Sequence, residues 1–156
     1  MRRALLLFAF AGALLAPATA IAGEAEWQAH VKLGMAAYQR GDYRTASTNF
    51  AAALKEAEAF GEADPRFATT INNLAFMLKE QGRYAEAEPL YRRTLSIYEK
   101  ALGPDHPSVG TTLWHQASAY ARQRRWSGGL PLIRRATRAM ATRFAGREDG
   151  ARTAVL

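Results

Sequence analysis

The chain has 156 residues, a net charge of +7 and no cysteine. This length fits one domain. The lack of cysteine excludes disulfides, thiolate metal sites and cysteine nucleophiles. Hydrophobic residues make up 49% of the chain, which is enough to build a core.

The first 22 residues have the composition of a signal peptide. Arg2 and Arg3 precede an apolar run over 4–16, in which no side chain is polar. That run is shorter than the roughly 20 residues that span a bilayer. The small-x-small pattern that a signal peptidase reads occurs twice, ending at Ala20 and at Ala22. We therefore expect cleavage after one of these residues. The expected destination of the exported chain is a bacterial periplasm. An uncleaved membrane anchor is the alternative.

Charge is distributed unevenly. Residues 23–108 hold 10 Lys and Arg against 12 Asp and Glu, whereas residues 109–156 hold 9 Arg against 2 acidic residues. Such asymmetry is typical of a chain that meets an acidic partner, an anionic lipid surface or nucleic acid, but a solvated basic face has the same composition. Export argues against nucleic acid as a partner.

An internal repeat runs through the rest of the chain. Residues 67–71 are echoed by residues 109–113, and residues 89–93 by residues 131–135, in both cases at a spacing of 42. A turn motif recurs with nearly the same spacing at 41–43, 82–84 and 124–126. Repeats of this length are typical of solenoids, in which one unit cannot bury its apolar face alone.

Each unit is predicted to be a pair of helices. Phe67, Ile71, Leu74 and Leu78 recur at spacings of three and four, which forms one apolar stripe on a helix. Gly82 is predicted to end that helix. Alternating strand patterns do not occur, so we predict an all-α solenoid. The expected boundaries are a domain over 23–145, units at about 26–60, 67–102 and 109–144, a last helix at about 127–144, and a disordered tail over 146–156.

Small residues are expected where the helices approach closely, and large ones between units. The small residues are Gly34, Ala75 and Ala117 on the first helices and Ala46, Ala87 and Gly129 on the second. The large residues predicted to fill the gaps between units are Tyr43, Tyr84 and Trp126, with Phe50, Tyr91 and Ile133. Asp105 is expected to cap the helix that follows it.

These residues resemble the signature of the tetratricopeptide repeat. Leu33-Gly34, Gly41-x-Tyr43, Ala46, Phe50 and Ala53 fit it in the first unit, and Leu74-Ala75, Gly82-x-Tyr84, Ala87 and Tyr91 in the second. The spacing of 42 and the strings at 72–75, 82–91 and 102–107 are similar to the kinesin-light-chain type. The third unit departs from the signature, with Gln116 in place of Leu and Arg124 in place of Gly.

The resemblance implies a right-handed superhelix whose concave groove, lined by the first helix of each unit, takes a peptide or a partner helix. Its groove positions are Lys32, Met35, Tyr38, Thr69, Asn72, Asn73, Phe76, Lys79, Trp114, His115 and Arg122. Asn73 and Asn72 are candidates for reading a peptide backbone, because an amide both donates and accepts hydrogen bonds. Trp114 is a candidate anchor. The Lys and Arg residues match a carboxylate clamp only loosely.

The open C-terminal end is a second candidate surface. The last predicted helix has no helix after it to cover an apolar stripe flanked by arginines. The residues assigned to this association surface are Leu132, Arg135, Met140 and Phe144.

Three functions are consistent with these patterns, and none is catalytic. The favoured function is an adaptor that binds a peptide or partner protein in the groove. The alternatives are an assembly subunit that self-associates through its Arg-rich last helix, and a membrane-surface protein held by an uncleaved anchor. The three histidines lack metal-ligand spacing, and phosphate-loop and nucleophile-elbow motifs do not occur, so neither a cofactor nor a metal is expected.

Overall fold

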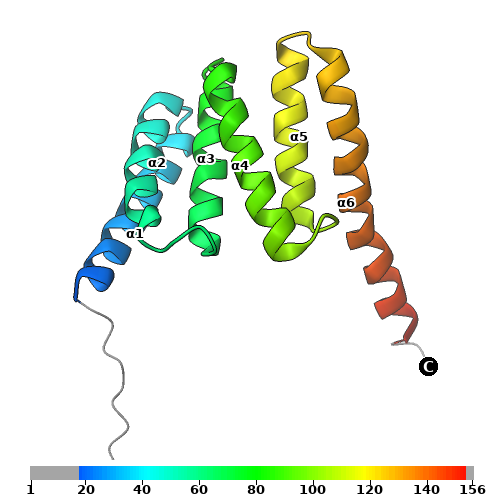
Figure 1. The fold of residues 1–156 in the computed structure, drawn as a ribbon, viewed down its shortest axis with the longest axis horizontal. Helices are drawn as coiled ribbons and strands as arrows, with labels where there is room; N and C mark the ends of the chain where they lie inside the picture. Colours follow the sequence, from blue (N-terminus) through cyan, green and yellow to red (C-terminus); the bar gives the residue numbers. More distant parts are fainter. Residues whose placement is uncertain (1–17, 154–156) are drawn as a thin grey trace, which may run out of the picture.

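The computed structural model describes the backbone of residues 18–153 and the side chains of residues 23–141. That part of the chain contains six α-helices and no strand, so the all-α solenoid prediction is confirmed. The helices are α1 (Ala18–Gln39), α2 (Tyr43–Glu58), α3 (Pro65–Glu80), α4 (Tyr84–Leu102), α5 (Pro107–Arg122) and α6 (Trp126–Thr153). Figure 1 shows them as three antiparallel pairs in one row, with α1–α2 and α5–α6 at its two ends.

The predicted signal peptide lies largely outside the described residues, which begin at Ala18. Both expected cleavage positions, after Ala20 and Ala22, fall in the first turns of α1, where the backbone is helical. Among the described residues, every helix is too short or too polar to cross a bilayer.

A tight turn with one left-handed residue joins the two helices of each pair. The φ angle is +74° at Gly41, +76° at Gly82 and +57° at Arg124. Glycine adopts this conformation without a steric penalty, whereas a residue with a Cβ pays roughly 1 kcal/mol. The third unit therefore keeps the turn of the other two although its sequence departs from the signature there.

A capping residue starts the first helix of each later unit. The Asp64 carboxylate accepts a hydrogen bond from the backbone N–H of Arg66 at 2.8 Å. At the same place in the next unit, His106 Nδ1 accepts one from the N–H of Ser108 at 3.1 Å. The cap expected from Asp105 is thus supplied by His106, because His106 and not Asp105 is in register with Asp64.

Small residues lie where the helices cross, as predicted. All six are buried: Gly34, Ala46, Ala75, Ala87, Ala117 and Gly129. A Cβ atom added to Gly34 would lie 3.1 Å from the ring of Phe50, so no larger residue fits without displacing that ring. Phe50 in turn belongs to a core cluster with Leu74 and Tyr91, which joins the first two units.

The prediction that Trp126 fills a gap between units is wrong. Its counterpart Tyr43 packs against the core cluster that joins the first two units, but Trp126 is 59% exposed. The difference has a simple physical reason: within the described residues, no helix comes after α6 to cover this position.

The last helix also runs further than predicted. α6 continues to Thr153, so most of the segment expected to be disordered from residue 146 has a helical backbone. Gly146 and Gly150 lie within it, and each costs about 1 kcal/mol relative to alanine. Glycine weakens a helix less than proline does, and the arginine and glutamate between the two glycines are good helix formers.

Two glycines, each the fourth residue of its helix, provide a matched test of close packing. Gly110→Ala in α5 places a Cβ 3.2 Å from the Cβ of Ala139 and 3.3 Å from the carbonyl oxygen of Ala136, whereas Gly129→Ala in α6 meets ordinary contacts of 3.4 Å or more. Alanine gains about 1 kcal/mol of helix propensity in both. Overpacking adds a cost of about 1–3 kcal/mol in Gly110→Ala but not in Gly129→Ala. We expect Gly110→Ala to lower the thermal midpoint and Gly129→Ala to preserve or raise it; equal midpoints would contradict the tight α5–α6 contact.

Candidate functional site

Three helices from successive units line a hollow on one face of the molecule, called here the α1/α3/α5 face. The hollow has a volume of about 220 Å³. Of the predicted groove residues it brings together Met35, Tyr38, Asn72, Asn73, Phe76 and His115, with Phe50 and Met77 behind them. More than half of the predicted groove residues therefore converge on one site, although they come from three helices far apart in the sequence.

A row of rings crosses the three units along this hollow. The ring of Tyr38 meets that of Phe76 edge-on at 5.8 Å between centroids, and Phe76 lies 4.7 Å from the imidazole of His115. Met35 and Tyr38 are exposed at the rim. A strip of aromatic rings thus lines the hollow and is partly open to solvent. Exposed aromatic surfaces of this kind can anchor apolar side chains of a partner.

The two neighbouring asparagines have different roles. Asn72 Oδ1 accepts a hydrogen bond from the hydroxyl of Thr112 at 3.2 Å, which joins α3 to α5. Asn73 makes no side-chain hydrogen bond to any described residue, although it lines the same hollow. Its amide is therefore an available polar group of the site.

The cationic groove candidates do not form a clamp. Lys79 is 5% exposed, its ammonium lies 2.7 Å from Glu80, and it also lies 4.3 Å from the centre of the Phe76 ring. Arg122 reaches the same Glu80 carboxylate at 3.4 Å. Lys32 is exposed on α1 and does not line the hollow. Two of the three cations thus share one carboxylate, and none of the three lines the hollow.

Two other predicted positions lie outside the hollow. The hydroxyl of Thr69 lies 3.1 Å from that of Tyr98, so it links α3 to α4. Trp114 is exposed on α5 but does not line the hollow. An exposed indole remains an anchor candidate for a partner larger than the hollow itself.

His115 has an unusual environment for an ionisable group. Its Nδ1 atom is buried and lacks a hydrogen-bond partner among the described residues. Burial lowers the pKa of His115 to about 4, with a further contribution from the charge of Lys79, against which Glu80 acts. His115 is therefore neutral near pH 7 and serves as a ring of the aromatic strip.

The predicted association surface on the last helix is only partly exposed. Leu132 and Met140 pack against the core cluster formed by Leu95, Val109, Leu113 and Ala136. Arg135 forms an ion pair with Glu99. The side chain of Phe144 lies outside the described residues. The stripe faces α5, because α6 must bury one face against its own partner helix. Among the described side chains of α6, the large apolar ones that are exposed are Trp126 and Leu130 instead.

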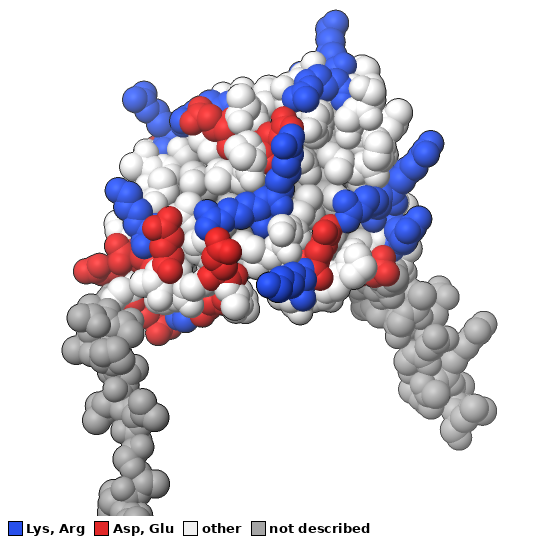
Figure 2. Space-filling view, in the orientation of Figure 1, with Lys and Arg blue, Asp and Glu red and all other residues white. Residues whose placement is uncertain are grey.

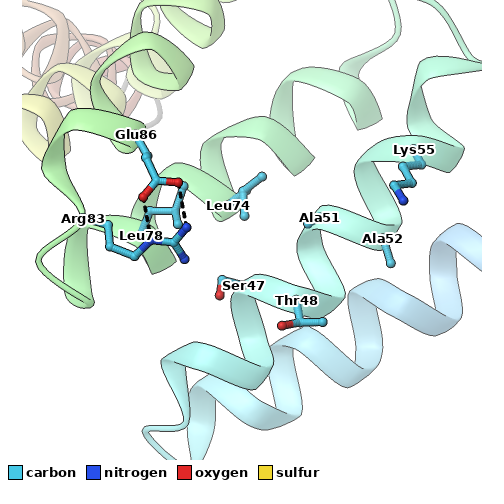
Figure 3. Close-up of a pocket in the computed structure, with 9 residues that line it drawn as sticks. All are labelled: Ser47, Thr48, Ala51, Ala52, Lys55, Leu74, Leu78, Arg83 and Glu86. Carbon is cyan, nitrogen blue, oxygen red and sulfur yellow. Dashed lines mark hydrogen bonds and ion pairs between the residues drawn. The ribbon is translucent and has the colours of Figure 1, made fainter.

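Sequence reasoning missed a second hollow of about 520 Å³, between the first two units. Figure 3 shows this seam, in which Leu74 and Leu78 of α3 face Ser47 and Ala51 of α2. The ion pair between Arg83, which precedes α4, and Glu86 in its first turn also lines the seam. The alanines of α2 are the signal that could have revealed it, because small residues leave room at the surface of the seam.

Among the described residues, no cluster of three or more histidine, aspartate or glutamate side chains is placed to hold a metal ion. The hollow is lined by aromatic rings, which include the phenol of Tyr38 and the neutral imidazole of His115, and by the amide of Asn73.

The buried neutral His115 predicts a pH-dependent stability. The unfolded chain binds a proton at His115 below pH about 6.5, but the folded chain does so only at about 4. Stability conferred by this residue is therefore complete above pH 6.5 and is lost as the pH falls toward 4. We expect the thermal midpoint to fall over this window more steeply for the native chain than for His115→Gln, measured by circular dichroism. Parallel curves would show that His115 is not buried as described.

Comparison with known families adds independent support for the fold. Residues 67–108 match the family model described as the tetratricopeptide repeat. The match covers α3, α4 and the start of α5. A comparison with curated proteins found no match. Tetratricopeptide repeats generally mediate protein–protein interactions, and their all-α fold is typically a non-catalytic module. The match and the row of stacked helix pairs together support a repeat protein of the tetratricopeptide type.

Proposed function

We propose that this protein is a non-catalytic interaction module that binds an extended segment of a partner protein on the α1/α3/α5 face. The observation that carries the proposal is the convergence of Met35, Tyr38, Phe76 and His115, from three successive units, around one hollow. A ligand seated there contacts all three units at once.

The size of the hollow favours a side chain over a free small molecule. Pockets for small ligands typically measure about 300–1,000 Å³, whereas this hollow measures about 220 Å³. One apolar or aromatic side chain of a peptide is a suitable occupant, with the rest of the peptide lying along the face. Exposed Met35 and Tyr38 at the rim are then covered.

The amide of Asn73 supplies the polar part of recognition. It is the hollow-lining amide without a hydrogen bond to a described residue, and an amide can pair with both the N–H and the C=O of a peptide main chain. This gives affinity without strict sequence preference. The lining of the hollow includes no Lys or Arg side chain, which favours an uncharged anchor over a terminal carboxylate.

Two finer features belong to the same proposal. The repeat spacing, seen between 67–71 and 109–113, supports the kinesin-light-chain type of repeat. The composition of the first 22 residues supports export to a periplasm, where the partner would be met. The earliest described side-chain contacts to another unit, the Glu24–Arg66 ion pair and the hydrogen bond from Trp27 to Thr70, begin just after the expected cleavage positions, so cleavage would leave them in place.

Binding to the groove can be tested without knowing the natural partner. Peptides selected from a displayed random library on the native chain should bind Asn73→Ala and Met35→Glu at least about tenfold more weakly, a loss of about 1.4 kcal/mol. Fluorescence anisotropy of the selected peptides measures this loss. The same peptides, or the natural partner captured from an exported extract, should be retained by the control variant.

The matched control is Leu33→Glu, which places the same charge on an exposed residue of α1 that does not line the hollow. Circular dichroism must show unchanged helical content in all variants. If Leu33→Glu weakens peptide binding as much as Met35→Glu, the binding surface is not the hollow.

Export is tested by the mass of the secreted chain. Expression in a bacterial host followed by intact-mass measurement should give a chain that starts at Ile21 or Gly23. A full-length chain in the membrane fraction would instead support the anchored, membrane-surface alternative.

A further inference from the structure

Because the repeat is regular, residues at the two ends of the row can be compared with equivalent residues inside it. The turn motifs at 41–43, 82–84 and 124–126 set the register, so each position in one unit has a counterpart in the next. Residues exposed at the ends therefore have interior counterparts whose neighbours are known. The neighbours of an interior counterpart indicate which kind of helix would cover the exposed residue at an end.

At the N-terminal end, Leu33 on α1 has no covering neighbour among the described residues. It is 56% exposed, whereas its counterparts Leu74 and Gln116 are 8% and 4% exposed. Leu74 is buried because it lies in the seam against α2 of the preceding unit (Figure 3). Leu33 thus occupies a position that the repeat covers with a preceding second helix.

At the C-terminal end, Leu130 and Trp126 on α6 are equally uncovered. Leu130 is 54% exposed, and its counterpart in the first unit is Ser47, which is buried in the same seam as Leu74. Trp126 is the counterpart of Tyr43, which packs against the core cluster shared by the first two units and whose carbonyl oxygen accepts a hydrogen bond from Gln81 of the second. One turn apart on α6, these two side chains form an apolar patch on the side that would face a following unit.

We propose that these two ends bind each other: α1 of a second copy packs on α6, with its Leu33 against Leu130 and Trp126. The contact repeats the way in which α3 packs on α2 within one chain. It is independent of the groove, because Leu33, Leu130 and Trp126 do not line the hollow on the α1/α3/α5 face.

Charge complementarity favours a second copy as the occupant. The described side chains of α6 include no acidic residue, and Arg134 and Arg138 add positive charge beside Arg135, which pairs with Glu99 of its own chain. Arg134 and Arg138 are the counterparts of Ala51 and Lys55, which line the seam. On the first unit, two of the positions that would face them carry negative charge, while Arg40 stands where the second unit has Gln81, whose amide donates to Ser47 across the seam.

The acidic positions are Asp42 and Glu26. Asp42 stands where the second unit has Arg83, another residue of the seam, and Glu26 stands where it has Phe67. Figure 2 shows acidic side chains gathered along the lower edge of the α1–α2 end, with basic ones above them, whereas basic side chains predominate over α6.

Such a contact joins two different surfaces, so it does not close into a symmetric dimer. A head-to-tail contact leaves one free end of each kind, and association continues into an open chain of copies. The assembly is thus a longer solenoid in which every copy still presents its own hollow.

The test is the molar mass of the full chain over a wide range of concentration, measured by size-exclusion chromatography with light scattering. We expect mass to rise with concentration, without a plateau at the dimer, and to fall with added salt. Leu33→Glu and Leu130→Glu should each be monomeric, while Leu102→Glu, an exposed leucine at the end of α4, should assemble like the native chain.

Mixing the two variants distinguishes this contact from any symmetric one. A Leu33→Glu chain keeps its α6 surface and a Leu130→Glu chain keeps its α1 surface, so an equal mixture should form a dimer and nothing larger. A native chain that stays monomeric at every concentration overturns the proposal. So does a mixture that stays monomeric, or assembly that persists in either variant alone.

A chain that starts at Gly23 is run in parallel. It should assemble like the full chain, and loss of assembly would mean that residues 1–22 make the contact instead. Leu33→Glu should lose assembly but keep peptide binding. The same variant therefore distinguishes a failure of the assembly proposal from a failure of the groove proposal.

Discussion

Close approach of paired helices is the constraint on which the rest of this structure depends. Phe50 illustrates it: its ring lies against Gly34 of its own pair and in one core cluster with Leu74 and Tyr91 of the next pair. A single pair has no such second surface, so each unit is completed by its neighbour. The hollow on the α1/α3/α5 face has the same origin, because stacking at this distance places the first helices of successive units side by side.

Much of the fold was predictable because its determinants are local and periodic. Apolar residues at helical spacing, glycines at left-handed turns and the regular recurrence of whole segments each report on nearest neighbours. The misjudged positions depend instead on which helix lies beyond them in space. Trp126 looks like Tyr43 in the sequence, but its exposure is decided by the lack of a covering helix among the described residues. Leu132 and Met140 similarly form a stripe whose direction only packing against α5 reveals.

The candidate site was predictable in position but not in chemistry. The repeat register indicates which side chains point toward one face, and most of them meet there. It does not indicate their partners. Asn72 and Asn73 are identical in type, yet only Asn72 is engaged by Thr112. Lys79 looks like a free cation, but its ammonium lies 3.4 Å from the hydroxyl of Ser118 in the next unit. Hydrogen bonds between units join residues far apart in the sequence, and no local pattern encodes them.

The cross-links between α3 and α5 have a consequence for the thermodynamics of recognition. The Asn72–Thr112 hydrogen bond and the contact of Lys79 with Ser118 at 3.4 Å lie on either side of Phe76 along α3. Both hold α3 and α5 together at the edge of the hollow. These two walls are therefore preorganised, and a ligand need not order them on arrival. The entropy lost on binding would fall mainly on the ligand, which favours partners that are already extended and stiff in their free state.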